Sequence, residues 1–228
     1  MGKDVIVACD FPNGRETLNF LDQFSEKKPF VKIGMELFYS EGPEIVRAIH
    51  DRGHRIFLDL KLHDIPNTVT RAMRVLSSLK VDIINVHAAG GCAMMQGARE
   101  ALDPEIKLIA VTQLTSTDEE MLHKELMIPG TIADTVRVYA ENAKRSGLDG
   151  VVCSPLEVGM IHAACGNSFL TITPGVRFSG GDVQDQKRVM TPAEAKKIGS
   201  DYIVMGRPIT QDPDPVSAYQ RALSDFAL

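Results

Sequence analysis

The sequence predicts a single (β/α)8 barrel domain over residues 1–228, and three observations support this fold. Apolar runs rich in Val and Ile occur eight times in 228 residues, or about once every 28.5 residues, as expected for strand–helix units. Most of the runs are continuous rather than alternating, which is typical of parallel strands covered on both faces. Residues 9–16, CDFPNGRE, lack the Gly-rich turn that favours the rival fold, a doubly wound open sheet.

Each apolar run is a predicted strand. In chain order the strands are Val5–Cys9, Phe30–Ile33, Arg55–Leu60, Val81–Val86, Lys107–Val111, Gly150–Cys153, Leu170–Thr173 and Tyr202–Met205.

Helical patterns with clear ends lie between these runs. Residues 42–53 have Pro43 at the start and Gly53 as a stop, and residues 66–79 carry apolar side chains at spacings of four and three. Three predicted capping boxes are Thr131–Asp134, Ser154–Glu157 and Thr191–Glu194. Three predicted C-terminal stops are Gly147, Gly166 and Gly199.

The composition is that of an ordinary globular protein, with 44% hydrophobic and 24% charged residues. A net charge of −5 with no basic run argues against nucleic-acid binding. No apolar stretch reaches the ~20 residues that cross a bilayer, so we expect no membrane segment. The four cysteines are scattered without Cys-x-x-Cys spacing, so we expect reduced thiols and a cytosolic location.

In such a barrel the functional side chains lie where the strands end. Polar residues follow nearly every predicted strand: Asp10, Lys32, Asp59 with Lys61, His87, Thr112 to Thr115, Ser154, Thr173 to Arg177, and Gly206 with Arg207. We expect Ser154 and Thr173 to be ordinary structural residues. The others predict one shared cleft at this end of the barrel.

Residues 57–69, FLDLKLHDIPNTV, place charges in an apolar strand. Residues two apart in a strand point to the same side, so Asp59 and Lys61 project together, with Phe57 deeper on that side. If strand order follows sequence, residues of the two preceding strands join them. The predicted alternating array is Asp10, Lys32, Asp59, Lys61 and Asp64.

This array favours catalysis over stability, because the cost of desolvating buried ion pairs offsets their attraction. A lysine flanked by carboxylates stays protonated, which argues against Schiff-base chemistry and favours proton donation to a developing carbanion. A neighbouring carboxylate would repel a substrate carboxylate and favour its loss as CO₂. The residues therefore suggest decarboxylation followed by protonation, and this logic requires no cofactor.

A metal site is the competing interpretation, with Asp59, His63, Asp64 and His87 as candidate ligands. Lys61 would place a cation in the middle of such a site, which disfavours a metal. We expect His63 to be a turn or interface residue and His87 to form hydrogen bonds behind the site. The prediction is that no metal is bound.

A phosphate site is predicted after the last two strands, where barrels often bind phosphate. Arg177 and Arg207 can each donate two hydrogen bonds, Gly206 permits close backbone approach, and Gln186 offers an amide. Gly180 and Gly181 indicate a flexible loop over residues 178–188 that could close as a lid.

Seven motifs together resemble one enzyme family along essentially the whole chain. They are VACD, VKIG, DLKLHDIPNT, NVHAAGG, VTQLTS, TPGVR and MGRPIT, and they are similar to orotidine 5′-monophosphate decarboxylases of the bacterial type. The resemblance implies conversion of orotidine 5′-monophosphate to UMP in de novo pyrimidine synthesis, without metal or organic cofactor.

The resemblance also implies a role for each matching position. Lys61 would protonate C6, Asp59 would crowd the leaving carboxylate, and Lys32 and Asp10 would contact the ribose. Thr115 would contact the base. The phosphate would be held by Arg177, Gln186, Gly206 and Arg207. The family acts as a homodimer in which the equivalents of Asp64 and Thr68 reach into the neighbouring site.

Two rivals remain open from the sequence. One is a Mg²⁺-dependent sugar-phosphate decarboxylase or hexulose-phosphate synthase of the same barrel type, which also carries Asp-x-Lys-x-x-Asp. The sequence DIPNT after the second aspartate and Gln186 favour the nucleotide enzyme. The other is a non-catalytic sensor of phosphate ligands on the same fold.

Overall fold

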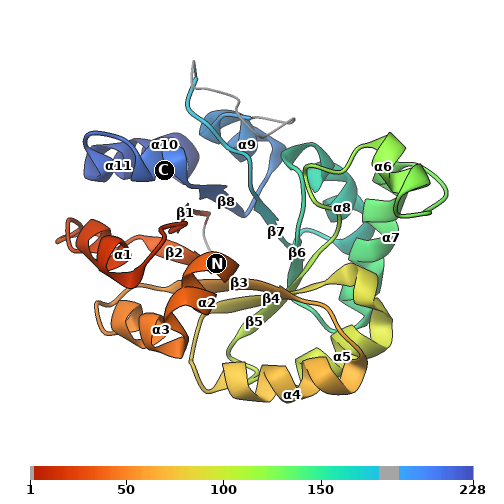
Figure 1. Ribbon diagram of the computed structural model, residues 1–228. Coiled ribbons are helices and arrows are strands. Elements are labelled where there is room, and N and C mark those ends of the chain that lie inside the picture. Colours follow the sequence, from red (N-terminus) through yellow and green to blue (C-terminus); the bar gives the residue numbers. More distant parts are fainter. Residues whose placement is uncertain (1–2, 180–189, 228) are drawn as a thin grey trace.

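The computed structural model describes residues 3–179 and 190–227 and shows a closed barrel of eight parallel strands (Figure 1). The strands pair in sequence order, and β1 closes the barrel against β8. Their bounds are β1 Asp4–Ala8, β2 Phe30–Gly34, β3 Ile56–Leu62, β4 Ile83–His87, β5 Lys107–Val111, β6 Gly150–Val152, β7 Leu170–Thr173 and β8 Tyr202–Met205. The predicted fold class is confirmed, and each predicted strand agrees with an observed one to within two residues at either end.

Helices follow the strands and form a ring around the barrel (Figure 1). The α-helices are α1 Gly14–Leu21, α2 Met35–Glu41, α3 Pro43–His50, α4 Pro66–Ser77, α5 Gly91–Ala101, α6 Glu119–Lys124, α7 Ile132–Arg145, α8 Val158–Cys165, α9 Pro192–Ile198, α10 Arg207–Thr210 and α11 Pro215–Phe226. Two short 3₁₀ helices are η1 Ala88–Gly90 and η2 Pro155–Glu157. In the described part of the chain, no helix combines the length and apolarity needed to span a membrane.

The predicted helix ends match the observed caps. Ser154 with Glu157 and Thr191 with Glu194 form complete capping boxes, while the Thr131 hydroxyl accepts a hydrogen bond from the Asp134 amide. Gly199 ends α9 in the left-handed conformation that glycine adopts without a steric cost. One feature escaped the sequence patterns: Gly42, at φ 68°, separates α2 from α3.

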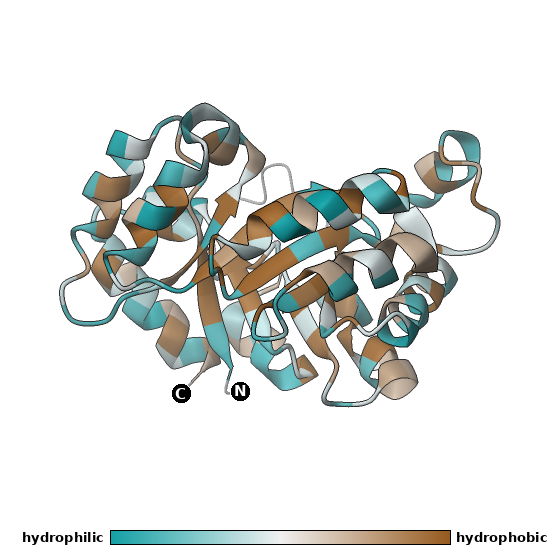
Figure 2. Ribbon diagram, turned by 90° about the horizontal axis from the view of Figure 1, so that it is seen from below, coloured by the Kyte–Doolittle hydropathy of each residue, from teal (hydrophilic) through white to brown (hydrophobic). Residues whose placement is uncertain are grey.

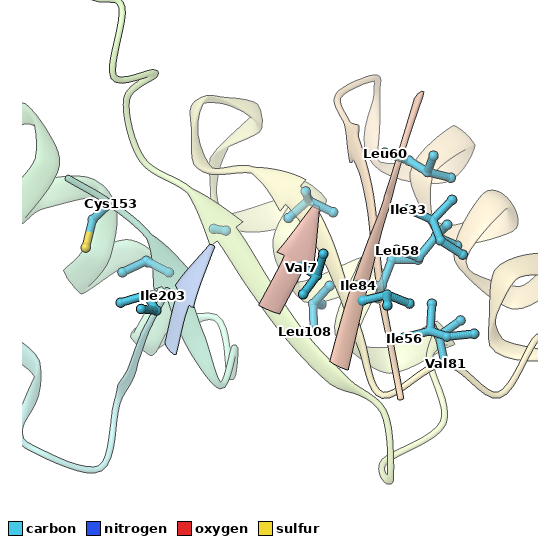
Figure 3. Close-up of a cluster of buried hydrophobic side chains, with 14 of the residues drawn as sticks. Val7, Ile33, Ile56, Leu58, Leu60, Val81, Ile84, Leu108, Cys153 and Ile203 are labelled. Atoms are coloured by element: carbon cyan, nitrogen blue, oxygen red, sulfur yellow. The ribbon is translucent and has the colours of Figure 1, made fainter. Parts of the chain in front are cut away.

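Two apolar layers arise from the alternation of side chains along the strands. Odd-numbered residues of β1 such as Val7 face the helices, where they pack in the outer core (Figure 3), and the even-numbered Ile6 and Ala8 face the barrel interior. In Figure 2 the strands are largely hydrophobic, and hydrophilic and hydrophobic residues alternate along the surrounding helices. The interior layer consists of Ile6, Ala8, Phe30, Phe57, Ile83, Ile109, Ile172, Tyr202 and Val204.

The amino-terminal end of the barrel is tied together by aspartates that precede β4, β6 and β8. Each accepts a hydrogen bond from an amide at the start of the preceding strand. The amides of Ile56, Leu108 and Thr171 donate to Asp82, Asp149 and Asp201 at 2.7, 2.8 and 2.8 Å. Since these bonds satisfy amides at strand ends, this end of the barrel is built for stability.

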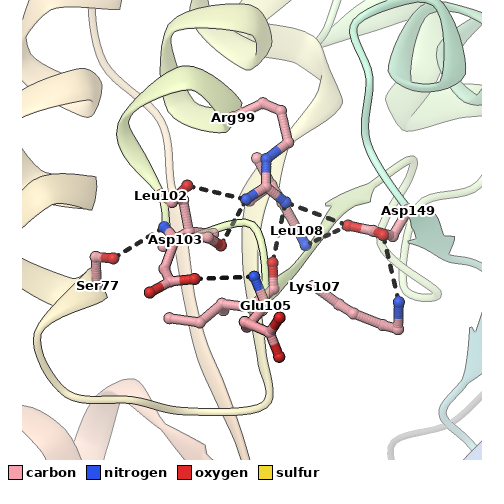
Figure 4. A network of polar contacts seen from close by, with 9 residues as sticks. Ser77, Arg99, Leu102, Asp103, Glu105, Lys107, Leu108 and Asp149 are labelled. Atoms are coloured by element: carbon pink, nitrogen blue, oxygen red, sulfur yellow. Dashed lines mark hydrogen bonds and ion pairs between the residues drawn. The ribbon is translucent and has the colours of Figure 1, made fainter.

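Arg99, Lys107 and Asp149 extend these contacts into what we call the base network (Figure 4). Arg99 lies 3.4 Å from the Asp149 carboxylate, as does the Lys107 amine. The Arg99 guanidinium also donates to the backbone carbonyls of Leu102, Asp103 and Ile106 at 3.0, 2.7 and 2.9 Å. Its charges therefore hold loops to strand ends.

Candidate active site

A second charged network lies at the opposite end of the barrel, where the strands end. The Lys32 amine is 3.0 Å from Asp10 Oδ1 and 3.3 Å from Asp59 Oδ2, and the Lys61 amine is 2.8 Å from Asp59 Oδ1. Asn85 Nδ2 donates to Asp59 Oδ1 at 2.6 Å. We call Asp10, Lys32, Asp59, Lys61 and Asn85 the mouth network. Strand alternation explains the positions of Lys32, Asp59 and Asn85, because each lies two residues after an inward-facing residue, Phe30, Phe57 or Ile83.

The Asp59 carboxylate is the centre of this network. Its side chain is 10% exposed, and it contacts two lysine amines and one amide. Burial by itself would raise the pKa of Asp59, but Lys32, Lys61 and Asn85 outweigh burial and hold it below its usual value. This carboxylate therefore stays ionised inside the barrel.

Lys32 shows the complementary balance. Burial would lower the pKa of its amine, yet the carboxylates of Asp59 and Asp10 together raise it above the usual value. Lys32 is thus a fixed cation between two anions, with a side chain that is 13% exposed.

The end of β3 departs from regular strand geometry at Lys61. The register against β4 shifts between Leu58 and Leu62, where β3 carries two residues more than β4, an irregularity of the bulge kind, and Lys61 has φ 51°. For a residue other than glycine, this left-handed backbone conformation costs roughly 1–2 kcal/mol of conformational free energy. Asp59 and Lys61 project together, as predicted, but an irregular end of β3 brings their side chains into contact where a regular strand was expected. Strain of this kind is concentrated at functional sites.

Asn85 is the residue that sequence reasoning missed. It lies on β4 and is 0% exposed, and its Oδ1 accepts a hydrogen bond from the Lys61 amide at 2.8 Å. A signal was present, since an asparagine stands in the apolar run 83–87 at an inward-facing position, two residues after Ile83. Asn85 lies within the strand, two residues before the exit residue His87, so it is not among the polar residues predicted at the strand exits.

A cavity of about 180 Å³ adjoins the mouth network. Lys32, Asp59 and Lys61 line one part, and apolar residues such as Val111 line most of the remainder. Thr115, the predicted base contact, also lines it. The cavity therefore offers a mostly apolar slot for a flat ring, with charges concentrated at one side.

A second cavity of about 620 Å³ shares Lys32, Pro174 and Val204 with the first. Arg177, Gly206 and Arg207, three of the predicted phosphate ligands, line it together with Asp10. A methyl group added at Gly206 would stand 3.4 Å from the Cβ of Ala8 and 4.0 Å from Asp10 Oδ2, in ordinary van der Waals contact with the residues beside this cavity. Gln186 and residues 180–188 of the predicted lid lie outside the described residues.

Asp64 and Thr68 do not join the mouth network within this chain. Both are exposed, and the Asp64 carboxylate accepts a hydrogen bond from the Ile65 amide at 2.6 Å. The prediction of a five-residue array that includes Asp64 is therefore wrong for the single chain. The physical reason is that the chain turns into α4 directly after β3 and carries residue 64 outward.

The remaining strand-exit residues have structural contacts. Ser154 caps η2, and the Thr173 hydroxyl lies 3.2 Å from the Tyr202 carbonyl, as expected for structural residues. The His87 ring contacts the His63 ring at a centroid distance of 5.6 Å, and burial lowers the pKa of His87. Within residues 3–179 and 190–227, no three His, Cys, Asp or Glu side chains are grouped to hold a metal ion.

This arrangement can stabilise negative charge that develops on a ring. Asp59 disfavours a substrate carboxylate beside it, and the Lys61 ammonium can donate a proton to the atom that the carboxylate leaves. The neighbouring cavity supplies two guanidinium groups, which suit a phosphate. The site thus fits a phosphate-bearing ring that loses a carboxylate.

Comparison with known proteins places the chain in a family. Residues 3–222 match the model of the orotidine 5′-phosphate decarboxylase / HUMPS family. An orotidine 5′-phosphate decarboxylase of Geobacillus sp. (strain WCH70) is 55% identical, over 99% of this chain and 98% of that protein. One from Streptococcus mutans is 57% identical, over 97% and 96%.

Solved structures agree with these relatives. The crystal structure of orotidine 5′-phosphate decarboxylase from Lactobacillus acidophilus has a TM-score of 0.89 and is 39% identical, covering 99% of this chain and 100% of that one. The chain belongs to the orotidine 5′-phosphate decarboxylase / HUMPS family.

Proposed function

We propose that this protein is an enzyme that decarboxylates orotidine 5′-monophosphate to UMP in pyrimidine biosynthesis. The observation that carries the proposal is the Lys61 amine at 2.8 Å from the Asp59 carboxylate, beside a ring-sized cavity that adjoins an arginine-lined one. Relatives that are 53–57% identical over nearly their whole length bear the name of this enzyme, which supports the proposal. The Mg²⁺-dependent sugar-phosphate alternative is not favoured.

In the proposed reaction the bond between C6 of the pyrimidine and its carboxylate breaks, and CO₂ leaves. The electron pair stays at C6, where the Lys61 ammonium stabilises it and then donates a proton to that carbon. Asp59 crowds the carboxylate before it leaves, and Lys32 keeps Asp59 ionised. Because Lys61 already supplies the positive charge, we propose that the reaction needs no metal or organic cofactor.

We assign the rest of the substrate by position. Asp10 and Lys32 would contact the ribose, since both line the larger cavity, and Thr115 would contact the base. Arg177, Arg207 and the backbone at Gly206 would hold the phosphate, with Gln186 as a further ligand. Binding energy from the phosphate would then be used to stabilise the transition state.

We further propose a homodimer in which Asp64 and Thr68 of each chain complete the partner's site. Both side chains are exposed beside Ile65, an apolar residue that is 66% exposed. A test is to mix Lys61→Ala with Asp64→Ala protein, each inactive alone, because shared sites would restore one intact site per heterodimer. Heterodimers that form and stay inactive would contradict sharing.

We place the enzyme in the cytoplasm. The four cysteines are free, which fits a reducing compartment.

The decisive experiment follows the absorbance change of orotidine 5′-monophosphate with and without EDTA. We expect turnover that chelation leaves unchanged. Loss of activity with EDTA would favour the Mg²⁺-dependent rival, and nucleotide binding without turnover would indicate a sensor.

A further inference from the structure

We infer that Asn85 is a positioning residue for the proposed decarboxylation, holding Lys61 and Asp59 in the geometry that proton donation requires. The inference rests on the proposed function and extends it to a residue that is not itself part of the lining of either described cavity. The relevant contacts come from the two ends of one carboxamide.

The amide nitrogen of Asn85 contacts Asp59, and its amide oxygen contacts Lys61. Asn85 Nδ2 donates to Asp59 Oδ1 at 2.6 Å, and Asn85 Oδ1 accepts from the Lys61 amide at 2.8 Å. Asp59 Oδ1 and the Lys61 amine are themselves 2.8 Å apart. The three residues therefore close a ring in which each fixes the other two.

The backbone of Lys61 explains why such a fastening is needed. The irregularity shifts the ladder between β3 and β4 at this point, and Lys61 has φ 51°. Its amide donates to the Asn85 side chain. A lysine in this conformation keeps it only when its surroundings impose it, and Asn85 supplies that constraint.

The chemistry of the carboxamide suits both contacts. Asp59 needs another donor that brings no titratable proton, while the Lys61 amide needs an acceptor. Asparagine provides one of each, is neutral, and is fully buried on β4, where Ile109 of β5 stands beside it. A leucine of similar size would provide neither contact, and an ionised aspartate would provide the acceptor alone.

The first test compares Asn85→Leu with the wild type. We expect kcat for orotidine 5′-monophosphate to fall about 100-fold, since a displacement of about 1 Å at reacting groups has that effect. The KM and the affinity for UMP should change by less than about threefold, because the phosphate and ribose contacts remain. A variant with wild-type kcat would overturn the inference, as would one in which KM alone rises.

The second test measures how the activity of Asn85→Asp depends on pH. If the role of Asn85 were purely structural, the pH dependence of activity would be the same as in the wild type. When protonated, the introduced carboxyl can donate to Asp59 and accept from the Lys61 amide, as the carboxamide does. The charged or titratable groups around it are Asp59 and Lys61 on β3, Lys32 on β2 and His87 on β4.

Burial and the Asp59 anion would raise the pKa of that introduced carboxyl. We therefore expect the ratio of Asn85→Asp activity to wild-type activity, measured at each pH, to rise as the pH falls. A constant ratio between the two enzymes across the folded pH range would contradict the inference. If Asn85→Leu does not fold, the pH dependence of this activity ratio is sufficient by itself to test the inference.

Thr171→Val is the matched control. Thr171 is also 0% exposed on a barrel strand, and its hydroxyl bonds to Asp201 at 2.9 Å, at the end of the barrel away from the mouth network. We expect this variant to lose stability and to keep the wild-type kcat. Absence of turnover in the wild type would overturn the proposed function, whereas an active wild type with an equally active Asn85→Leu would overturn only this inference.

Discussion

The two ends of the barrel carry charged networks that are built differently. In the base network, Arg99 and Asp149 bond mainly to backbone groups, so their charges fasten loops to strand ends (Figure 4). In the mouth network, Lys32 and Lys61 bond to carboxylates beside open cavities, and Lys61 adopts a strained backbone conformation.

This difference separates stability from function within one fold. A charge that satisfies a buried amide or carbonyl removes the cost of leaving that group unpaired. A charge held against another charge beside a cavity gains little net stability, because desolvation offsets the attraction. We therefore expect substitutions at the mouth to reduce catalysis and those at the base to reduce stability.

The largest expected effect is at Lys61. Lys61→Ala should lower kcat by about 10⁴-fold or more, because it removes both the proton donor and the cation that faces the developing carbanion. Single-turnover assays with orotidine 5′-monophosphate measure this directly. Turnover near the wild-type rate would show that Lys61 is not the proton donor. It would also contradict the assignment of the mouth network to catalysis.

A smaller effect is expected at Arg207, which lines the larger cavity at the mouth. Loss of hydrogen bonds from a guanidinium to phosphate should weaken UMP binding by about 10- to 100-fold in Arg207→Ala. Isothermal titration calorimetry checks this value. Unchanged affinity would show that the phosphate lies elsewhere.

Substitutions in the base network should lower the free energy of unfolding and leave kcat unchanged. Asp149→Ala leaves the Leu108 amide without its acceptor and should lower the free energy of unfolding by about 2 kcal/mol, with kcat unchanged. Asp149→Asn keeps an acceptor oxygen and should lose less. Urea unfolding measures the stability of both variants. A loss of kcat without a loss of stability would contradict the assignment of the base network to stability.

The eight strands and the barrel could be predicted from the sequence because each strand coincides with a largely apolar run, and recognisable helix ends lie between the runs. The pairing of Lys32, Asp59 and Lys61 was also predictable, since alternation fixes which side chains face inward. These features depend on local sequence and on a closed order of strands.

Other features depend on contacts between distant residues and could not be predicted. The irregularity at Lys61 arises from the register of β3 against β4, and Asn85 acquires its role only through that register. The outward placement of Asp64 follows from the turn into α4. The sequence predicts that Asp64 lies in the turn before Pro66, but it does not predict that this turn leaves the side chain exposed.

The free energy of unfolding of Lys61→Gly tests most directly the claim that the mouth network sustains strain for catalysis. Glycine adopts φ 51° without a steric cost, and Asp59 retains its contacts with Lys32 and Asn85. The account predicts a variant that is at least as stable as the wild type in urea unfolding, and inactive. A loss of about 3 kcal/mol or more, the cost of leaving a buried charge uncompensated, would contradict it, because it would show that Asp59 depends on Lys61 for its stability.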